Sequence, residues 1–243
     1  MNIMNRALVL SMAALLLSLP LCASAQWDKK PYAEWSEKEV NKVLNDSPWG
    51  RTQVFTSPVT LFRGPTTGRQ GVGQPTSSRP ADATHVNFRI RFFSAKPVRQ
   101  AVSRLMTMKQ KQPISDELAT QLKTLASGDF LEYIVITVSC DSEDTGGNVQ
   151  EALSLLRTRG TAELKNNTFL EVKGGRRLFL QEFQPPRQDG LGARFIFKRL
   201  VDGESFITPN SEEIRFFTEL NDTYRLDRRF KVKDMMYDGK LEY

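Results

Sequence analysis

An acidic loop at residues 141–148 holds the residue types that could best do chemistry. It reads DSEDTGGN and carries carboxylates at Asp141, Glu143 and Asp144. Oxygen donors followed by a glycine at the sixth position imitate half of a calcium loop, but the twelfth position is Ala152 where a bidentate glutamate is needed. The favoured interpretation is that the same charges stabilise the N-terminus of a following helix. The three carboxylates are therefore weak candidates for a metal site, and the loop's role stays open.

The same loop supplies the alternative in which the protein is an enzyme. Carboxylates such as Asp141, Glu143 and Asp144 could act as acid and base in a hydrolase that cleaves cell-envelope material. No serine lies in a nucleophile elbow, and the glycine-rich residues 68–73 lack the lysine and hydroxyl residue of a phosphate-binding loop. We therefore expect no catalytic residue, no cofactor and no metal, and favour a protein that is not an enzyme.

Cys140 and His85 are the one remaining pair that could form a nucleophile and its base. Cys22 falls within an apparent leader, and His85 is the single histidine of the chain. If their two strands run parallel, the residues lie about 25 Å apart at ~3.3 Å per residue. Only an antiparallel arrangement could bring them together. The competing interpretation is that Cys140 is a small buried apolar residue.

Basic residues form two groups. Lys173, Arg176 and Arg177 surround one predicted turn, and a second group near the C-terminus includes Arg228, Arg229, Lys231 and Lys233. They could be the solvent face of ordinary strands. They could also bind an anionic partner, either an envelope protein or an anionic polysaccharide. We expect no nucleic-acid binding, because no nucleic-acid module is visible.

A short helix near the N-terminus is predicted after Ser36. Ser36 and Glu39 have the spacing of a capping box, and Pro48 ends the helix. Trp35 and Trp49 flank it. Both tryptophans could pin the helix to the core, or they could contact a carbohydrate or peptide.

Two terminal segments carry a resemblance. EWSEKEV at residues 34–40 with NDSPWG at residues 45–50, and RFKVKDM at residues 229–235 with GKLEY at residues 239–243, are similar to the two ends of a group of uncharacterised exported bacterial proteins. The group has no assigned activity, so the resemblance implies export and no site residue.

The first 25 residues predict a cleaved signal peptide. Arg6 precedes an apolar run, and Ala23-Ser-Ala25 has the small residues of a cleavage site. The formal net charge of the whole chain is +6, and the leader contributes only Arg6 to it. Nothing after residue 25 is long and apolar enough to span a membrane. We expect a soluble, basic protein that is periplasmic or secreted.

The core elements can be placed by their periodicity. Residues 85–93 alternate as a half-buried strand, and residues 97–112 and 115–128 predict two helices, with Arg99 on the solvent side of the first. A buried strand at residues 133–138 and a third helix at residues 149–157 follow. The later chain predicts hairpins, including a strand at residues 176–183 and a last hairpin at residues 229–243. Residues 214–217 fit either a strand or a helix.

These elements predict an α+β fold, with helices of the N-terminal half packed on a largely antiparallel sheet and a C-terminal half of β-hairpins. The expected organisation is a signal peptide at residues 1–25, an N-terminal helix and first strand at 26–63, a flexible loop or linker at 64–82, and a core at 83–243. Residues 26–243 are expected to form one structural unit. The sequence favours a binding or structural module for an envelope protein or an anionic polymer.

Overall fold

The computed structural model describes residues 30–57, 84–110, 113–142 and 148–243. The chain divides into two compact units, residues 1–31 and 32–243, and the architecture below is that of the second. The predicted leader at residues 1–25 and the predicted loop at 64–82 lie outside the described residues. Within those residues, no helix combines the length and apolar character that a membrane crossing requires.

Two antiparallel sheets form the body of the second unit. The first, called sheet A, has the order β1-β2-β3-β7-β6, and the second, sheet B, has the order β11-β10-β4-β5. The strands of sheet A are β1 (Gly50–Ser57), β2 (Thr84–Phe92), β3 (Tyr133–Asp141), β7 (Ala193–Lys198) and β6 (Glu182–Gln184). Those of sheet B are β11 (Arg225–Lys231), β10 (Glu213–Glu219), β4 (Thr168–Val172) and β5 (Arg177–Phe179).

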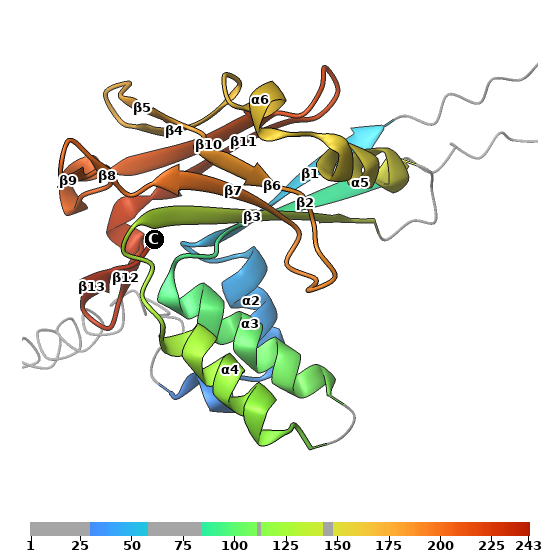
Figure 1. The fold of residues 1–243 in the computed structure, drawn as a ribbon, viewed down its shortest axis with the longest axis vertical. Coiled ribbons are helices and arrows are strands. Elements are labelled where there is room, and N and C mark those ends of the chain that lie inside the picture. The colour runs from blue at the N-terminus through green and yellow to red at the C-terminus, as the bar shows by residue number, and fades with distance from the viewer. Residues whose placement is uncertain (1–29, 58–83, 111–112, 143–147) are drawn as a thin grey trace, which may run out of the picture. The chain divides into compact units, whose positions relative to one another are not determined.

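The first helices of this unit cover the outer face of sheet A. Figure 1 shows α2, α3 and α4 on one side of β1, β2 and β3, with sheet B on the other side. The helices are α2 (Glu37–Asn45), α3 (Lys96–Lys109), α4 (Asp116–Ser127), α5 (Asn148–Thr158) and α6 (Thr161–Leu164), with a 3-10 turn η3 (Tyr32–Glu34) before them. The predicted α+β class is confirmed, including helices in the first half and strands in the second.

Aromatic side chains fill the space between the two sheets. Phe88 and Phe92 project from β2, as the period of two predicts, and both are fully buried. The ring of Phe92 meets Phe230 of β11 edge to face at 4.9 Å. Phe195 of β7 meets Phe216 of β10 at 5.4 Å. Burial of this aromatic area provides the main stabilisation of the sandwich.

The chain passes from sheet B to sheet A at a bend after β5. The N–H of Leu180 still donates to Thr168 of sheet B, whereas the N–H of Gln181 donates to Ile196 of sheet A. The prediction of one strand at residues 176–183 is therefore wrong, because the strand bends to turn a corner between sheets. This bend joins the sheets at one edge and leaves β1 and β11 as the free strands of the opposite edge.

Capping residues begin α2 and α4 as predicted, but one burial prediction is wrong. Ser36 and Glu39 form the capping box of α2, and Ser115 caps α4. Arg99, predicted on the solvent side of α3, is only 2% exposed. Its guanidinium donates to the carbonyl oxygens of Ser94, Leu125 and Gly128. The end of α4 therefore supplies two of the three acceptors that make this burial possible.

The later elements differ in part from the sequence prediction. Residues 214–217 are strand, within β10. The last predicted hairpin is wrong at its start, because β11 ends at Lys231 and a 3-10 turn η5 (Val232–Asp234) follows. The hairpin that does form pairs β12 (Met236–Tyr237) with β13 (Lys240–Leu241), and β8 (Leu200–Val201) pairs with β9 (Glu204–Ser205).

The two terminal segments that carry the resemblance lie against one another. The indole N–H of Trp49 donates to the carbonyl oxygen of Glu242 at 2.8 Å. The carboxylate of Glu242 accepts from the N–H of Lys96 at 2.8 Å. The N-cap of α3 is Ala95, which has no capping side chain, so Glu242 supplies an acceptor at this helix end. The C-terminus is thereby fixed to the first helical layer.

Candidate functional site

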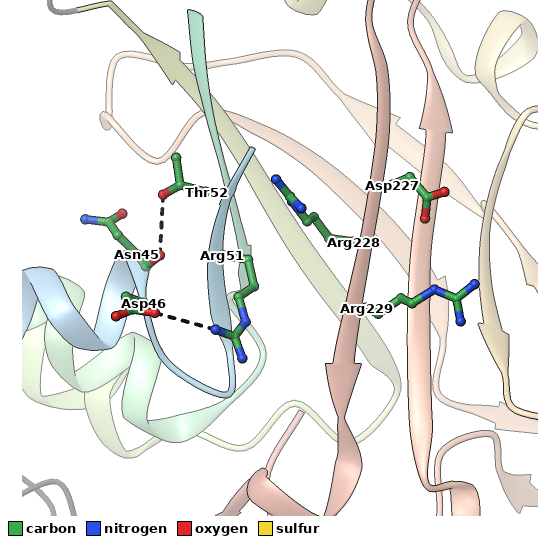
Figure 2. A pocket seen from close by; sticks show the side chains of 7 residues that line it. All are labelled: Asn45, Asp46, Arg51, Thr52, Asp227, Arg228 and Arg229. Carbon is green, nitrogen blue, oxygen red and sulfur yellow. Dashed lines mark hydrogen bonds and ion pairs between the residues drawn. The ribbon is translucent and has the colours of Figure 1, made fainter. Parts of the chain in front are cut away.

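A cleft of about 850 Å³ opens where the free edges of the two sheets come side by side. One wall is the end of α2 with the start of β1, and the other is β11 (Figure 2). The lining residues are Asn45, Asp46, Arg51, Thr52, Asp227, Arg228 and Arg229. Charged and amide groups dominate this set, so the cleft suits a polar ligand.

Gln53 bridges β1 and β11 at one end of the cleft. Its amide nitrogen donates to the carbonyl oxygen of Arg225 at 2.9 Å, and its amide oxygen accepts from the N–H of Asp227 at 3.0 Å. A side chain from β1 thus takes the place of a neighbouring strand on the edge of β11. Beyond Gln53 the two strands are not paired with each other, and the cleft lies there.

On the wall formed by α2 and β1, Arg51 and Thr52 make only long polar contacts. Arg51 approaches the carboxylate of Asp46 at 3.5 Å, and the hydroxyl of Thr52 donates to the carbonyl oxygen of Asn45 at 3.4 Å. Both distances are at the long end for hydrogen bonds. The Asp46 side chain is 78% exposed, so this ion pair contributes little to stability. Arg51 is consequently available to a ligand in the cleft.

Arg228 brings a positive charge and an unsatisfied hydrogen-bond donor to the cleft. It lies on the core-facing side of β11 between Leu226 and Phe230, which are both fully buried. Figure 2 shows its side chain directed toward β1. Its Nε is buried without a hydrogen-bond partner. Among the described residues, no carboxylate lies within ion-pair distance of Arg228, and the nearby carboxylate of Asp227 already pairs with Arg215.

The other two charged residues of β11 that line the cleft are already paired. Figure 2 shows Asp227 and Arg229 directed away from β1. Asp227 accepts from two nitrogens of Arg215 at 2.8 and 2.7 Å, and this pairing lowers the pKa of Asp227 below its ordinary value. Arg229 donates to Glu213 at 2.7 Å. These two residues therefore line the cleft mainly with main-chain atoms at the edge of β11.

A smaller depression of about 460 Å³ lies beside the end of β11. Its cations include Lys231 and Lys233, for which the described residues offer no acid within ion-pair distance, and Lys173, which pairs with Glu212. Arg229 lines both this depression and the cleft. The basic C-terminal group predicted from the sequence is thus divided between two adjoining hollows.

The predicted hairpin arginines do not join this site. Arg176 donates to the carbonyl oxygen of Phe206 at 2.9 Å and stacks over its ring. Arg177 donates to the carboxylate of Glu171 and lies 4.3 Å from the centre of the Phe169 ring. Both guanidinium groups serve contacts within the fold, and neither lines the cleft.

The acidic loop gives no assembled site in the described residues. The carboxylate of Asp141 accepts a hydrogen bond from a terminal nitrogen of Arg89 at 3.1 Å. It accepts another from the side-chain amide of Asn87 at 3.4 Å. Glu143 and Asp144 lie outside the described residues, so their predicted role stays a prediction. Across the residues that the structure describes, no three acidic, histidine or cysteine side chains could hold a metal ion together.

Asp141 borders a second cavity of about 670 Å³ between sheet A and the helices. Arg91 crosses this space to donate to Leu44 and Asn45 of α2, and burial with the nearby charge of Arg89 lowers the pKa of Arg91 to about 10. The polar groups at this face thus attach α2 to the sheet. We assign no binding role to them.

Cys140 and His85 do not form a dyad. β2 and β3 are antiparallel, the arrangement that could have brought the two together. The register nevertheless places Cys140 opposite Phe88, three residues beyond His85 and on the other face of the sheet. Burial raises the pKa of the Cys140 thiol to about 12, and His85 instead contacts the Thr56 hydroxyl at 3.0 Å.

Trp35 and Trp49 are core residues. Their exposed fractions are 0% and 2%, so neither presents a surface to a carbohydrate or peptide. Trp49 packs edge to face on Tyr237 at 6.1 Å, and Trp35 packs similarly on Tyr32 at 6.4 Å. Both side chains hold the first helical layer in place.

The sequence indicated only one wall of the cleft. Arg228 and Arg229 belong to the predicted basic group, whereas Arg51 and Gln53 carry no signal, because their role depends on β11 reaching β1 from the other end of the chain. No protein-family model, curated protein or solved structure matches this chain. The site is therefore defined by its geometry and charge.

Proposed function

We propose that this protein is a non-enzymatic binding module that holds an anionic partner in the cleft between β1 and β11. The observation that supports this most is Arg228, a half-buried arginine whose Nε has no hydrogen-bond partner and which has no described acid within ion-pair distance. A buried polar group without a partner costs free energy that an incoming anion would return. A carboxylate, sulfate or phosphate presents the oxygen acceptors that a guanidinium binds best.

The surroundings of Arg228 support an extended anionic partner over a small ion. The cleft is open, and Arg51 lies on its opposite wall. Lys231 and Lys233 continue the positive charge into the adjoining depression. A chain with repeated negative charges could engage these groups together, whereas a single ion could engage one of them.

The signal-like residues 1–25 support a partner in the cell envelope. For a periplasmic or secreted protein, the anionic partners include acidic protein segments and anionic polysaccharides. The hydrolase alternative has no comparable support, because Asp141 is engaged by Arg89 and Asn87.

Binding to dextran sulfate and to poly-glutamate at low and high salt tests the proposal. Arg228→Gln removes the charge and keeps a polar side chain of moderate length. A charged hydrogen bond contributes roughly 1.5–3 kcal/mol, so we expect binding to weaken by about tenfold or more. Binding to the unaltered protein should also weaken as salt screens the charges.

Arg187→Gln is the matched control, since it removes one arginine from an exposed loop position outside the cleft. It should bind both polymers as the unaltered protein does. Equal binding by Arg228→Gln and Arg187→Gln, or no binding of either polymer by the unaltered protein at any salt concentration, would overturn the proposal.

A further inference from the structure

We infer that the partner in the cleft is an extended acidic peptide segment that adds to the edge of β11 as a further strand. The inference rests on the proposed function and names the class of partner. It is carried by the main-chain groups along the edge of β11, which the charge argument does not use.

The hydrogen-bond register shows which residues of β11 point outward. The N–H of Val232 donates to Glu212, and the N–H of Leu220 donates to Tyr224. In the antiparallel register that pairs Arg215 with Arg229, both bonds belong to the even-numbered positions of this segment. Since residues alternate between the two sides of a strand, Arg225, Asp227 and Arg229 direct their N–H and C=O groups to the free edge.

Gln53 shows that this edge accepts a strand-like partner. It bonds to the C=O of Arg225 and the N–H of Asp227, which are the groups that a neighbouring strand would use. Two positions further along, the N–H and C=O of Arg229 bond to no residue in the described parts of the chain. Arg229 lines the cleft, so an incoming peptide would meet these two groups directly.

Charge then selects the side chains of the peptide. Successive side chains of an added strand point to opposite faces of the sheet. Those on the core-facing side come beside Arg228 and opposite Arg51, so a glutamate or aspartate there would compensate the unpaired guanidinium. The open stretch from Asp227 to Lys231 is about 14 Å long at ~3.4 Å per residue, which accommodates about five peptide residues.

A polysaccharide could bind the charged side chains of the cleft but could not pair with the main chain of β11. Its sulfate or carboxylate groups could satisfy Arg228, but sugars lack the alternating N–H and C=O groups that pair with a strand edge. Addition of a strand to an exposed edge derives its affinity from main-chain bonds and its specificity from alternate side chains. The free edge and the unpaired Arg228 together favour the peptide.

The first experiment measures binding of the capped pentapeptide Thr-Val-Glu-Val-Thr by calorimetry. We expect saturable binding, and a loss of about tenfold when the central glutamate is replaced by glutamine. Methylating the peptide main-chain nitrogens that face the protein removes its donors, and should cost at least as much. Equal binding of the methylated and unmethylated peptides would overturn the inference.

The second experiment removes one N–H from the protein. Arg229→Ala and Arg229→Pro lose the same charge, but only the proline variant also loses the outward N–H. Proline is tolerated on an edge strand where that N–H bonds to no neighbour. We expect the proline variant to bind the peptide about tenfold more weakly than the alanine variant and to bind dextran sulfate equally well.

Thermal unfolding shows whether Arg229→Pro is folded, and if it is not, the methylated peptide decides. Equal peptide binding by folded alanine and proline variants would overturn strand addition. Binding of dextran sulfate without binding of the peptide would leave the proposed function standing and make the partner a polysaccharide. Absence of binding to both probes would remove the proposed function as well.

Discussion

The Oε1 atom of Gln53 accepts a hydrogen bond from the main-chain N–H of Asp227 at 3.0 Å, although the residues are 174 positions apart. The same amide donates to Arg225. Two edge strands that could have paired along their length are instead joined through one side chain. This limited closure joins the two edges at one point and leaves the neighbouring edge of β11 open.

Replacing Gln53 by alanine should therefore weaken the contact between β1 and β11. The change removes two neutral hydrogen bonds, each contributing about 0.5–1.5 kcal/mol, so the free energy of unfolding should fall by about 1–3 kcal/mol. Hydrogen exchange at the Asp227 amide, measured by NMR, should accelerate. Gln53→Glu is the matched variant, since it keeps the acceptor for Asp227 and loses the donor to Arg225. Unchanged exchange at Asp227 in the alanine variant would contradict this account.

Features that depend on neighbours in sequence could be predicted. The Ser36 capping box and the alternation of Phe88 and Phe92 are set within a few residues, and both were predicted correctly. The cleft depends on β11 meeting β1, so neither Gln53 nor Arg51 has a local signal. Arg99 illustrates the same limit, because two of the carbonyl groups that it binds lie at the end of a different helix.

Arg99 should be among the polar residues most important for stability. It is 2% exposed and donates to carbonyl oxygens of Ser94, Leu125 and Gly128. Arg99→Met leaves these acceptors without their donor, and the cost should be about 3 kcal/mol or more, because hydrogen bonds from charged groups contribute ~1.5–3 kcal/mol each. Urea denaturation measures the loss.

Two comparisons separate the fork of Arg99 from its charge. Arg99→Lys keeps the charge but cannot present several planar donors, so it should recover only part of the stability. Arg104 lies on the same helix and donates one hydrogen bond to the carbonyl oxygen of Trp35 at 2.9 Å. Arg104→Met should therefore lower the free energy of unfolding by less than Arg99→Met. A folded Arg99→Met protein as stable as the unaltered one would show that the buried guanidinium does not hold α4.

The thiol of Cys140 should be unreactive while the protein is folded. Burial, with the nearby charge of Asp141, raises its pKa to about 12 from an ordinary value of about 9. A shift of this size reduces the thiolate at pH 8 by about a thousandfold. Iodoacetamide labelling of a Cys22→Ser variant, followed by mass spectrometry, should be slow in buffer and fast in denaturant. Equally rapid labelling in both would contradict the burial of this thiol.

The same shift predicts a pH effect on stability. The folded thiol keeps its proton to a higher pH than the unfolded thiol, so the folded state binds more protons above the ordinary thiol pKa. Stability should therefore fall as the pH rises from about 8.5 toward the folded value. Cys140→Ala should lose less stability over this range than the unaltered protein. The difference between the two denaturation curves measures the contribution of Cys140, because the other titrating groups are shared.

Arg228 should destabilise the free protein while it provides affinity for the partner. Its Nε is buried without a bond, and its strand neighbours on the same face, Leu226 and Phe230, are fully buried. Methionine can follow the apolar part of the arginine side chain without leaving an unsatisfied donor. Arg228→Met should therefore raise the free energy of unfolding by about 1–2 kcal/mol.

Arg225→Met provides the comparison, because Arg225 is exposed on the same strand and pairs with Glu219 at 3.0 Å. It should leave stability nearly unchanged, since exposed ion pairs contribute little. The decisive result is the combination of measurements: Arg228→Met should gain stability in urea denaturation and lose binding to poly-glutamate. These opposite changes are expected if Arg228 serves binding at a cost to the stability of the protein. If Arg228 served only the fold, its replacement would lower the stability and leave binding unchanged.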